Sequence, residues 1–147
     1  MDKKLKIDIN FEDELKMLLD QSIELQLLSQ ESHYNIEGSQ FGPLHTFFQE
    51  QYEYYFELVD TLSERIRQLG FLVSLSVDYS NLVSSDPNVI LKYNIDSLYL
   101  LATSLREVIA EVNKTTDFAT GNILIDTLQD VEKQVWKVRS IIGATEG

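Results

Sequence analysis

Apolar side chains recur every three or four positions over four long stretches of the chain, which is the spacing of one face of an α-helix. The pattern predicts helices over about Asn10 to Glu37, about Gln40 or Pro43 to Gly70, about Ile95 to Asn113 and about Thr120 to Ile142. Only six glycines and two prolines occur in 147 residues, so few positions interrupt these stretches. Four amphipathic helices of this length predict an all-α protein with its core between the helices.

The segment between the second and third helices, residues 71–92, mixes short apolar runs with serine, asparagine, aspartate and Pro87. It predicts a long connection that holds a short helix of its own. A connection this long is unusual unless it crosses a bundle or serves a function. Four helices with one long crossover in the middle fit a ferritin-like bundle better than a simple up-and-down bundle. We expect a single domain over 1–147, with short tails at 1–9 and 143–147.

The chain has no cysteine, which excludes disulfides, zinc–thiolate sites and iron–sulfur clusters. No apolar run approaches the roughly 20 residues that span a membrane, and no apolar segment follows the charged N-terminus as in a secretory signal. We therefore expect a cytoplasmic protein without a membrane partner. The net charge of −12 predicts a surface that attracts cations and repels DNA phosphates and anionic lipid.

The chain's only two histidines, His33 and His45, form the pattern H-x11-H-x14-D-x3-E with Asp60 and Glu64. All four side chains can bind iron, and the mixed set suits Fe(II), Mn(II) or Zn(II) better than Ca(II) or Mg(II). Asp60 and Glu64 share one helical face, whereas His45 lies about 22 Å away along the same helix. Two copies of this helix, antiparallel about a two-fold axis near Glu53 or Tyr54, would bring the two ends together. The spacing therefore predicts a metal site shared by two subunits; the alternative is four residues on solvated helix faces.

The residues around these positions resemble the signature of the Dps family, the mini-ferritins known as DNA-binding proteins from starved cells. The family pattern H-W-x-x-x-G-x-x-F-x-x-L-H is similar to residues 33–45, and D-x-x-A-E-R-x-x-x-L-G is similar to residues 60–70. Near the start of the last helix, Thr120-Gly121-Asn122, Asp130 and Trp136 look like the family's T-x-D, D and W. The resemblance covers nearly the whole chain.

The resemblance implies a four-helix bundle with a short helix in the middle (B–C) connection, assembled as a hollow dodecamer. It implies a ferroxidase site at the two-fold interface, with His33 and His45 from one subunit and Asp60 and Glu64 from its partner. Fe(II) would be oxidised there by hydrogen peroxide or O2 and stored as ferric oxide in the cavity. Zinc and manganese are alternative occupants of the same ligands.

The chain departs from the family pattern at three positions, of which Ser63 in place of a small Ala is a harmless change. Tyr34 stands where the family has Trp, and it either donates an electron beside a peroxide-reducing site or only packs. Asn122 replaces an Asp expected near the three-fold iron pore, which removes one carboxylate per subunit. Asp117 and Asp126 are near enough in sequence to compensate, or they are solvated acids at a helix end.

Five acids, at positions 50, 53, 57, 60 and 64, follow one another at spacings of 3, 4, 3 and 4 along the second helix. The functional interpretation is a cavity wall that gathers iron and nucleates mineral, with Glu50 and Glu53 as the best candidates. The alternative is an exposed helix face.

Two other functions are weighed against the ferroxidase. DNA compaction requires basic tails, but the chain offers only Lys3, Lys4 and Lys6 near its start and no basic residue after Gly143, so the sequence argues against DNA binding. A bacterioferritin or di-iron oxidase with its site inside each bundle needs Glu-x-x-His motifs, which the chain lacks. A purely structural bundle leaves the spacing of the four ligands unexplained.

Overall fold

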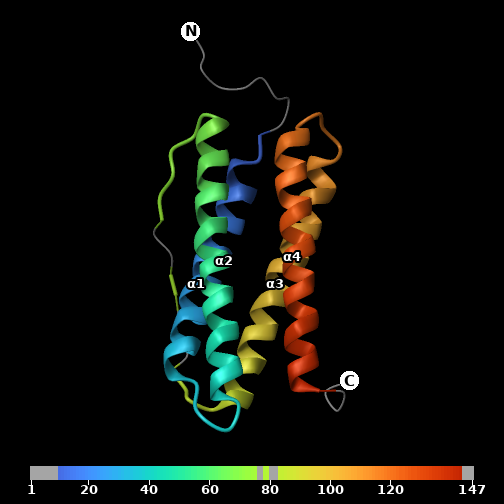
Figure 1. The fold of residues 1–147 in the computed structure, drawn as a ribbon. Helices are drawn as coiled ribbons and strands as arrows, with labels where there is room; N and C mark the ends of the chain where they lie inside the picture. The colour runs from blue at the N-terminus through green and yellow to red at the C-terminus, as the bar shows by residue number, and fades with distance from the viewer. Residues whose placement is uncertain (1–9, 76–77, 80–82, 144–147) are drawn as a thin grey trace.

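A computed structural model describes residues 10–75, 78–79 and 83–143 of the chain. It contains the helices α1 (Glu12–Asn35), α2 (Phe41–Gln68), α3 (Pro87–Val112) and α4 (Phe118–Ile142), and no strand among the described residues. The predicted all-α four-helix bundle is confirmed (Figure 1).

The four helices form two antiparallel pairs, α1 with α2 and α3 with α4 (Figure 1). The connection between α2 and α3 returns from one end of the bundle to the other, so these two helices point in the same direction. The helix α1 also packs on α3, whereas the backbones of α2 and α4 make little contact. Side chains from α2 and α4 therefore have to bridge this open side of the bundle.

The third helix begins at Pro87, earlier than the predicted start at Ile95. The carboxylate of Asp86 caps it by accepting a hydrogen bond from the backbone N–H of Asn88 at 2.9 Å. Pro87 occupies the first turn, where a missing N–H leaves no hydrogen bond unmade. The polar residues that the sequence analysis assigned to a loop are thus a helix start.

The short helix predicted in the middle connection does not occur in its described residues, 71–75, 78–79 and 83–86. Residues 76–77 and 80–82 of the same connection lie outside the described residues. The Tyr79 hydroxyl donates a hydrogen bond to Glu31 of α1 at 3.1 Å, and the N–H of Glu37 donates to the carbonyl of Ser85 at 3.1 Å. These contacts with α1 and its end take the place of helical hydrogen bonds, which is why the prediction was wrong for the described part.

The core is built from apolar side chains of all four helices. Among the most completely buried are Leu15, Leu18, Phe48, Tyr55, Leu98 and Leu124. Burying each such side chain stabilises the fold by roughly 1.5–3 kcal/mol relative to exposure, so packing between helices dominates the stability. Among the described residues, no helix is both long and apolar enough to cross a membrane.

Candidate metal centre

The two histidines lie face to face where α1 ends and α2 begins. The rings of His33 and His45 are stacked, with centroids 3.7 Å apart and planes inclined by 16°. Each ring also contacts the other residue's backbone: His33 Nδ1 lies 2.7 Å from the carbonyl oxygen of His45, and His45 Nδ1 lies 2.7 Å from the carbonyl oxygen of His33. His33 and His45, twelve residues apart in the sequence, thus form a reciprocal hydrogen-bonded pair.

This reciprocal pair assigns the proton on each imidazole. A backbone carbonyl only accepts hydrogen bonds, so each Nδ1 must donate and carry the ring proton. In the neutral ring, each Nε2 then keeps a lone pair, which is the form that binds a metal ion. The packing around the rings fixes their orientation, since Phe41 lies edge-on to His45 and Tyr52 lies edge-on to His33.

The two predicted carboxylates, Asp60 and Glu64, are exposed one turn apart toward the other end of α2. Neither forms a hydrogen bond or an ion pair with the described residues. Fifteen helical residues separate His45 from Asp60, which corresponds to about 22 Å. Accordingly, no group of three or more His, Asp or Glu side chains that could hold a metal ion occurs within the described part of one chain.

The aromatic residue Tyr34 lies beside the histidine pair but points largely into solvent. Its side chain is 65% exposed, and its ring contacts His33 edge-on with centroids 5.5 Å apart. Its hydroxyl accepts a hydrogen bond from the side-chain amide of Gln30 at 2.9 Å. The role of Tyr34 therefore stays a prediction.

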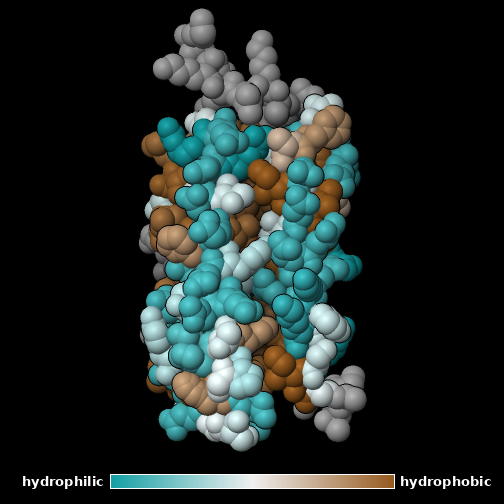
Figure 2. Space-filling view, in the orientation of Figure 1, coloured by the Kyte–Doolittle hydropathy of each residue, from teal (hydrophilic) through white to brown (hydrophobic). Residues whose placement is uncertain are grey.

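The acidic face of α2 borders two adjoining hollows between α2 and α4. Glu50 lines the first, of about 220 Å³, and Glu57 lines the second, of about 240 Å³. Tyr54 and Asp130 line both hollows and are joined by a hydrogen bond of 3.0 Å from the Tyr54 hydroxyl. Glu53 is exposed and accepts a hydrogen bond from Gln49 at 3.1 Å. On the face shown in Figure 2, hydrophilic side chains cover most of α2 and α4, and apolar side chains show in the seam between them and along the edges of the view.

Of the three residues predicted near a pore, Asp117 has a structural position. Its carboxylate is 3% exposed, forms an ion pair with Arg65 at 2.8 Å and caps α4 by accepting a hydrogen bond from the N–H of Thr120 at 3.2 Å. Asn122 and Asp126 are exposed one turn apart on α4, and Asp126 lines the second hollow. Only Asn122 and Asp126 therefore present free polar groups on one helical face.

Sequence reasoning missed two features of this region. One is the buried pair of Arg65 and Asp117, whose partners are fifty-two residues apart and come together only through the packing of α2 against α4. The other is the set of nitrogen groups in the first hollow, which includes Lys133 and Lys137. The sequence indicates this nitrogen-lined hollow only through the spacing of the two lysines by one helical turn. That spacing is common on solvent-exposed helices.

The comparisons with known proteins agree with the fold. The family model described as a ferritin-like domain matches residues 12–147. This chain therefore belongs to the ferritin-like family. Within that family, the likeness to Dps proteins is confirmed by the relatives described next.

A DNA protection during starvation protein of Helicobacter pylori is 28% identical over 135 residues, covering 86% of this chain and 94% of that protein. An uncharacterised protein of Haemophilus influenzae is 30% identical over 112 residues, covering 71% of this chain and 70% of its own length. The crystal structure of the Dps protein of Vibrio cholerae shares the fold with a TM-score of 0.84 at 24% identity, covering 90% of this chain and 88% of that one.

Proposed function

We propose that this chain is a Dps-type ferroxidase and iron-storage protein. It oxidises Fe(II) with hydrogen peroxide or O2 at a site shared across a two-fold interface, and it stores ferric oxide in the cavity of a hollow cage, as a dodecamer. The observation that carries the proposal is the histidine pair, in which each imidazole uses Nδ1 for the hydrogen bond to the other residue's carbonyl group and leaves Nε2 for a metal ion. Among the described residues of the same chain, no carboxylates join the pair to complete a metal site.

The chemistry of the two half-sites is complementary. His33 and His45 supply nitrogen ligands, and Asp60 and Glu64 of a second copy would supply charged oxygen ligands, a set that suits Fe(II) and leaves positions open for an oxidant. Each peroxide molecule accepts two electrons, so two Fe(II) ions become two Fe(III) ions and the O–O bond breaks to give two hydroxides. The Vibrio cholerae protein is described as a member of the ferritin-like diiron-carboxylate proteins, which supports iron as the metal.

The surface of α2 supports an antiparallel contact between two copies. Phe56 lies between the histidine end and the carboxylate end of the helix, and its side chain is 60% exposed in the single chain. A two-fold axis near Glu53 brings Phe56 of both copies close to the axis, where they would bury apolar area on each other. The same axis places each histidine pair beside the other copy's Asp60 and Glu64.

Complementation between two inactive variants tests the shared site. One variant carries His33→Ala and His45→Ala, and the other carries Asp60→Asn and Glu64→Gln. Each alone should oxidise Fe(II) slowly under anaerobic conditions with peroxide, as followed by ferric absorbance. After dissociation and joint reassembly at equal amounts, about a quarter of the sites contain both intact halves, because half the dimers are mixed and each holds one intact site.

Recovery of about a quarter of the wild-type rate supports a site built from two chains. No recovery in a mixture that reassembles normally would show that the four residues act within one chain or not at all. A matched control, Asp96→Asn with Glu111→Gln, removes two carboxylates from exposed ion pairs on α3 and should leave the rate unchanged.

A further inference from the structure

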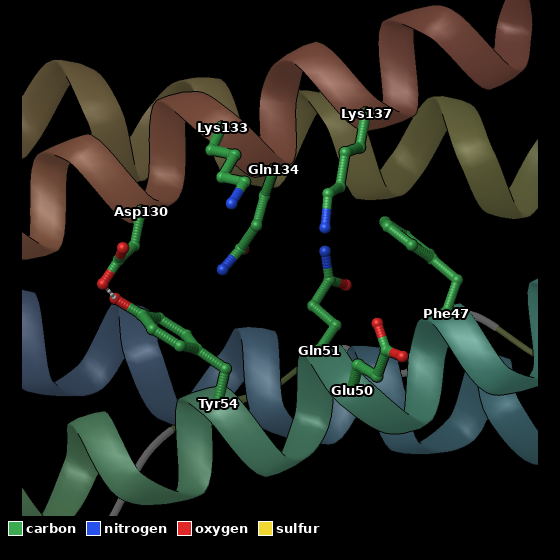
Figure 3. A pocket seen from close by; sticks show the side chains of 8 residues that line it. All are labelled: Phe47, Glu50, Gln51, Tyr54, Asp130, Lys133, Gln134 and Lys137. Carbon is green, nitrogen blue, oxygen red and sulfur yellow. Dashed lines mark hydrogen bonds between the residues drawn. The ribbon is translucent and has the colours of Figure 1, made fainter.

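The first hollow between α2 and α4 has a lining that the ferroxidase site does not use. Its volume is about 220 Å³, and its walls are formed by α2 residues on one side and α4 residues on the other. Figure 3 shows that the nitrogen atoms of Lys133, Gln134 and Lys137 on α4 point into the same space as the side-chain nitrogen of Gln51 on α2. Hydrogen-bond donors of α4 therefore face a hydrogen-bond donor of α2 across the hollow.

The orientations of the two amides are fixed by their oxygen atoms. Gln51 is 3% exposed, and its oxygen accepts hydrogen bonds from Ser29 at 2.7 Å and from Asn94 at 2.6 Å. The oxygen of Gln134 accepts a hydrogen bond of 2.6 Å from the buried Tyr55 hydroxyl. Because its oxygen is engaged, the Gln134 NH2 group is left for the hollow, whereas the Gln51 nitrogen already donates to the buried Asn94 at 3.3 Å. The fold therefore holds the amide donor of Gln134 toward the hollow.

The two lysines in the hollow have no acidic partner. Neither Lys133 nor Lys137 forms an ion pair or a hydrogen bond with the described residues, although the chain carries a net charge of −12. The carboxylates of the hollow lie at its edges: Asp130 receives the Tyr54 hydroxyl at 3.0 Å, and Glu50 lies beside Phe47 (Figure 3). Positive charge and the amide donor of Gln134 are thus gathered at the centre, and negative charge is kept at the rim.

We propose that this hollow binds a tetrahedral oxyanion, and specifically inorganic phosphate. The lysine ammonium groups supply charge, and the amide of Gln134 supplies a directed donor, which together are the groups that bind phosphate strongly. The binding itself does not depend on iron. Only its consequence rests on the proposed function: if α2 and α4 line the iron cavity, bound phosphate lies next to Glu50 and is deposited with Fe(III) in the mineral.

Binding of phosphate to the metal-free protein tests the site by calorimetry, with phosphorus NMR line width as a second measure. The double variant Lys133→Gln and Lys137→Gln should weaken phosphate binding by about tenfold or more, since two charge-assisted hydrogen bonds are lost. The matched control, Lys92→Gln with Lys114→Gln, removes the same charge from exposed positions on and just after α3 and should change the affinity little. Equal weakening in both double variants would mean that phosphate responds only to net charge, and this would overturn the proposal.

Two single variants make the test independent of the lysines. Gln134→Glu keeps an acceptor for the Tyr55 hydroxyl but replaces the amide donor by a negative oxygen, so it should abolish phosphate binding while circular dichroism stays unchanged. Glu50→Gln removes a carboxylate from the rim and should tighten phosphate binding. Unchanged affinity in Gln134→Glu, or no phosphate binding by the wild type at millimolar concentration, would overturn the site. Binding of duplex DNA with the same dependence on the two lysines would instead assign the surface to nucleic acid.

Failure of this proposal is distinguishable from failure of the ferroxidase proposal. Phosphate binding is measured without iron, and the complementation experiment is measured without phosphate. A protein that passes one test and fails the other identifies which of the two sites is wrongly assigned.

Discussion

Replacing Asp117 by Ala removes one partner of the most deeply buried ion pair among the described residues. The side chains of Arg65 and Asp117 are 8% and 3% exposed, and their charged atoms lie 2.8 Å apart. The guanidinium also donates to Thr120 at 2.9 Å and to Gln68 at 3.0 Å. In the variant, a buried guanidinium loses its counter-charge and α4 loses its N-terminal cap.

The magnitude follows from this burial. Removing one partner of a buried pair costs about 3–5 kcal/mol, because the remaining charge stays desolvated, and a lost cap by itself costs about 1 kcal/mol. Both effects act through the same carboxylate oxygen, so we expect a total near the buried-pair value and not a full sum. Such a loss is a large part of the roughly 5–15 kcal/mol that holds a domain of this size folded.

Urea denaturation at a fixed protein concentration measures the effect. The control Asp96→Ala breaks an ion pair whose side chains are 71% and 57% exposed, and it should cost less than about 1 kcal/mol. The double variant Arg65→Met with Asp117→Leu should recover much of the stability, since it buries no unpaired charge. If Asp117→Ala were as stable as the control but lost iron uptake, the reasoning from burial would be refuted and the pore role of Asp117 restored.

Three further outcomes are expected. Gly38 has a φ of 116°, so Gly38→Ala should destabilise the protein by about 1 kcal/mol or more. Gly42 lies in a helix with open space where a Cβ would be, so Gly42→Ala should stabilise the protein by up to about 1 kcal/mol. Thermal unfolding of the two variants tests the two opposite signs. Burial raises the pKa of Glu24, and Asp20 raises that pKa further, so the folded state favours the protonated carboxyl group. Glu24→Gln should therefore stabilise the protein at neutral pH. This gain should disappear when unfolding is repeated at acidic pH, where Glu24 is protonated in both states. Burial, the charge of Asp130 and the hydrogen bond to Asp130 raise the pKa of the Tyr54 hydroxyl above the usual 10.0. The hydroxyl's contribution to stability is therefore complete below pH 10 and is lost as the pH rises above that value. Tyr54→Phe should reduce this alkaline loss of stability in urea titrations.

Much of the fold could be predicted from local patterns. The apolar periodicity located all four helices, because burying one face of each helix requires that spacing. The start of α3 was misplaced, since Asp86, Pro87 and Asn88 are as typical of a loop as of a capped helix start, and only the hydrogen bond between Asp86 and Asn88 distinguishes them. The short helix in the middle connection was wrong for the described residues, because contacts with α1 replace local hydrogen bonds there.

The sequence alone determined which residues are candidates for the proposed iron site. Two histidines, two carboxylates and a helical rise of about 1.5 Å per residue are enough to conclude that one chain cannot close the site. This conclusion depends only on helix geometry, which is local.

Only the tertiary structure decided how these candidates are held. It stacked His33 on His45 and assigned each ring proton through the other's carbonyl group, a contact across a helix–helix turn. It also buried Asp117 against Arg65. Hydrogen bonds and ion pairs between residues far apart in sequence depend on how the helices pack, and that packing cannot be read from the spacing of residues along any one helix.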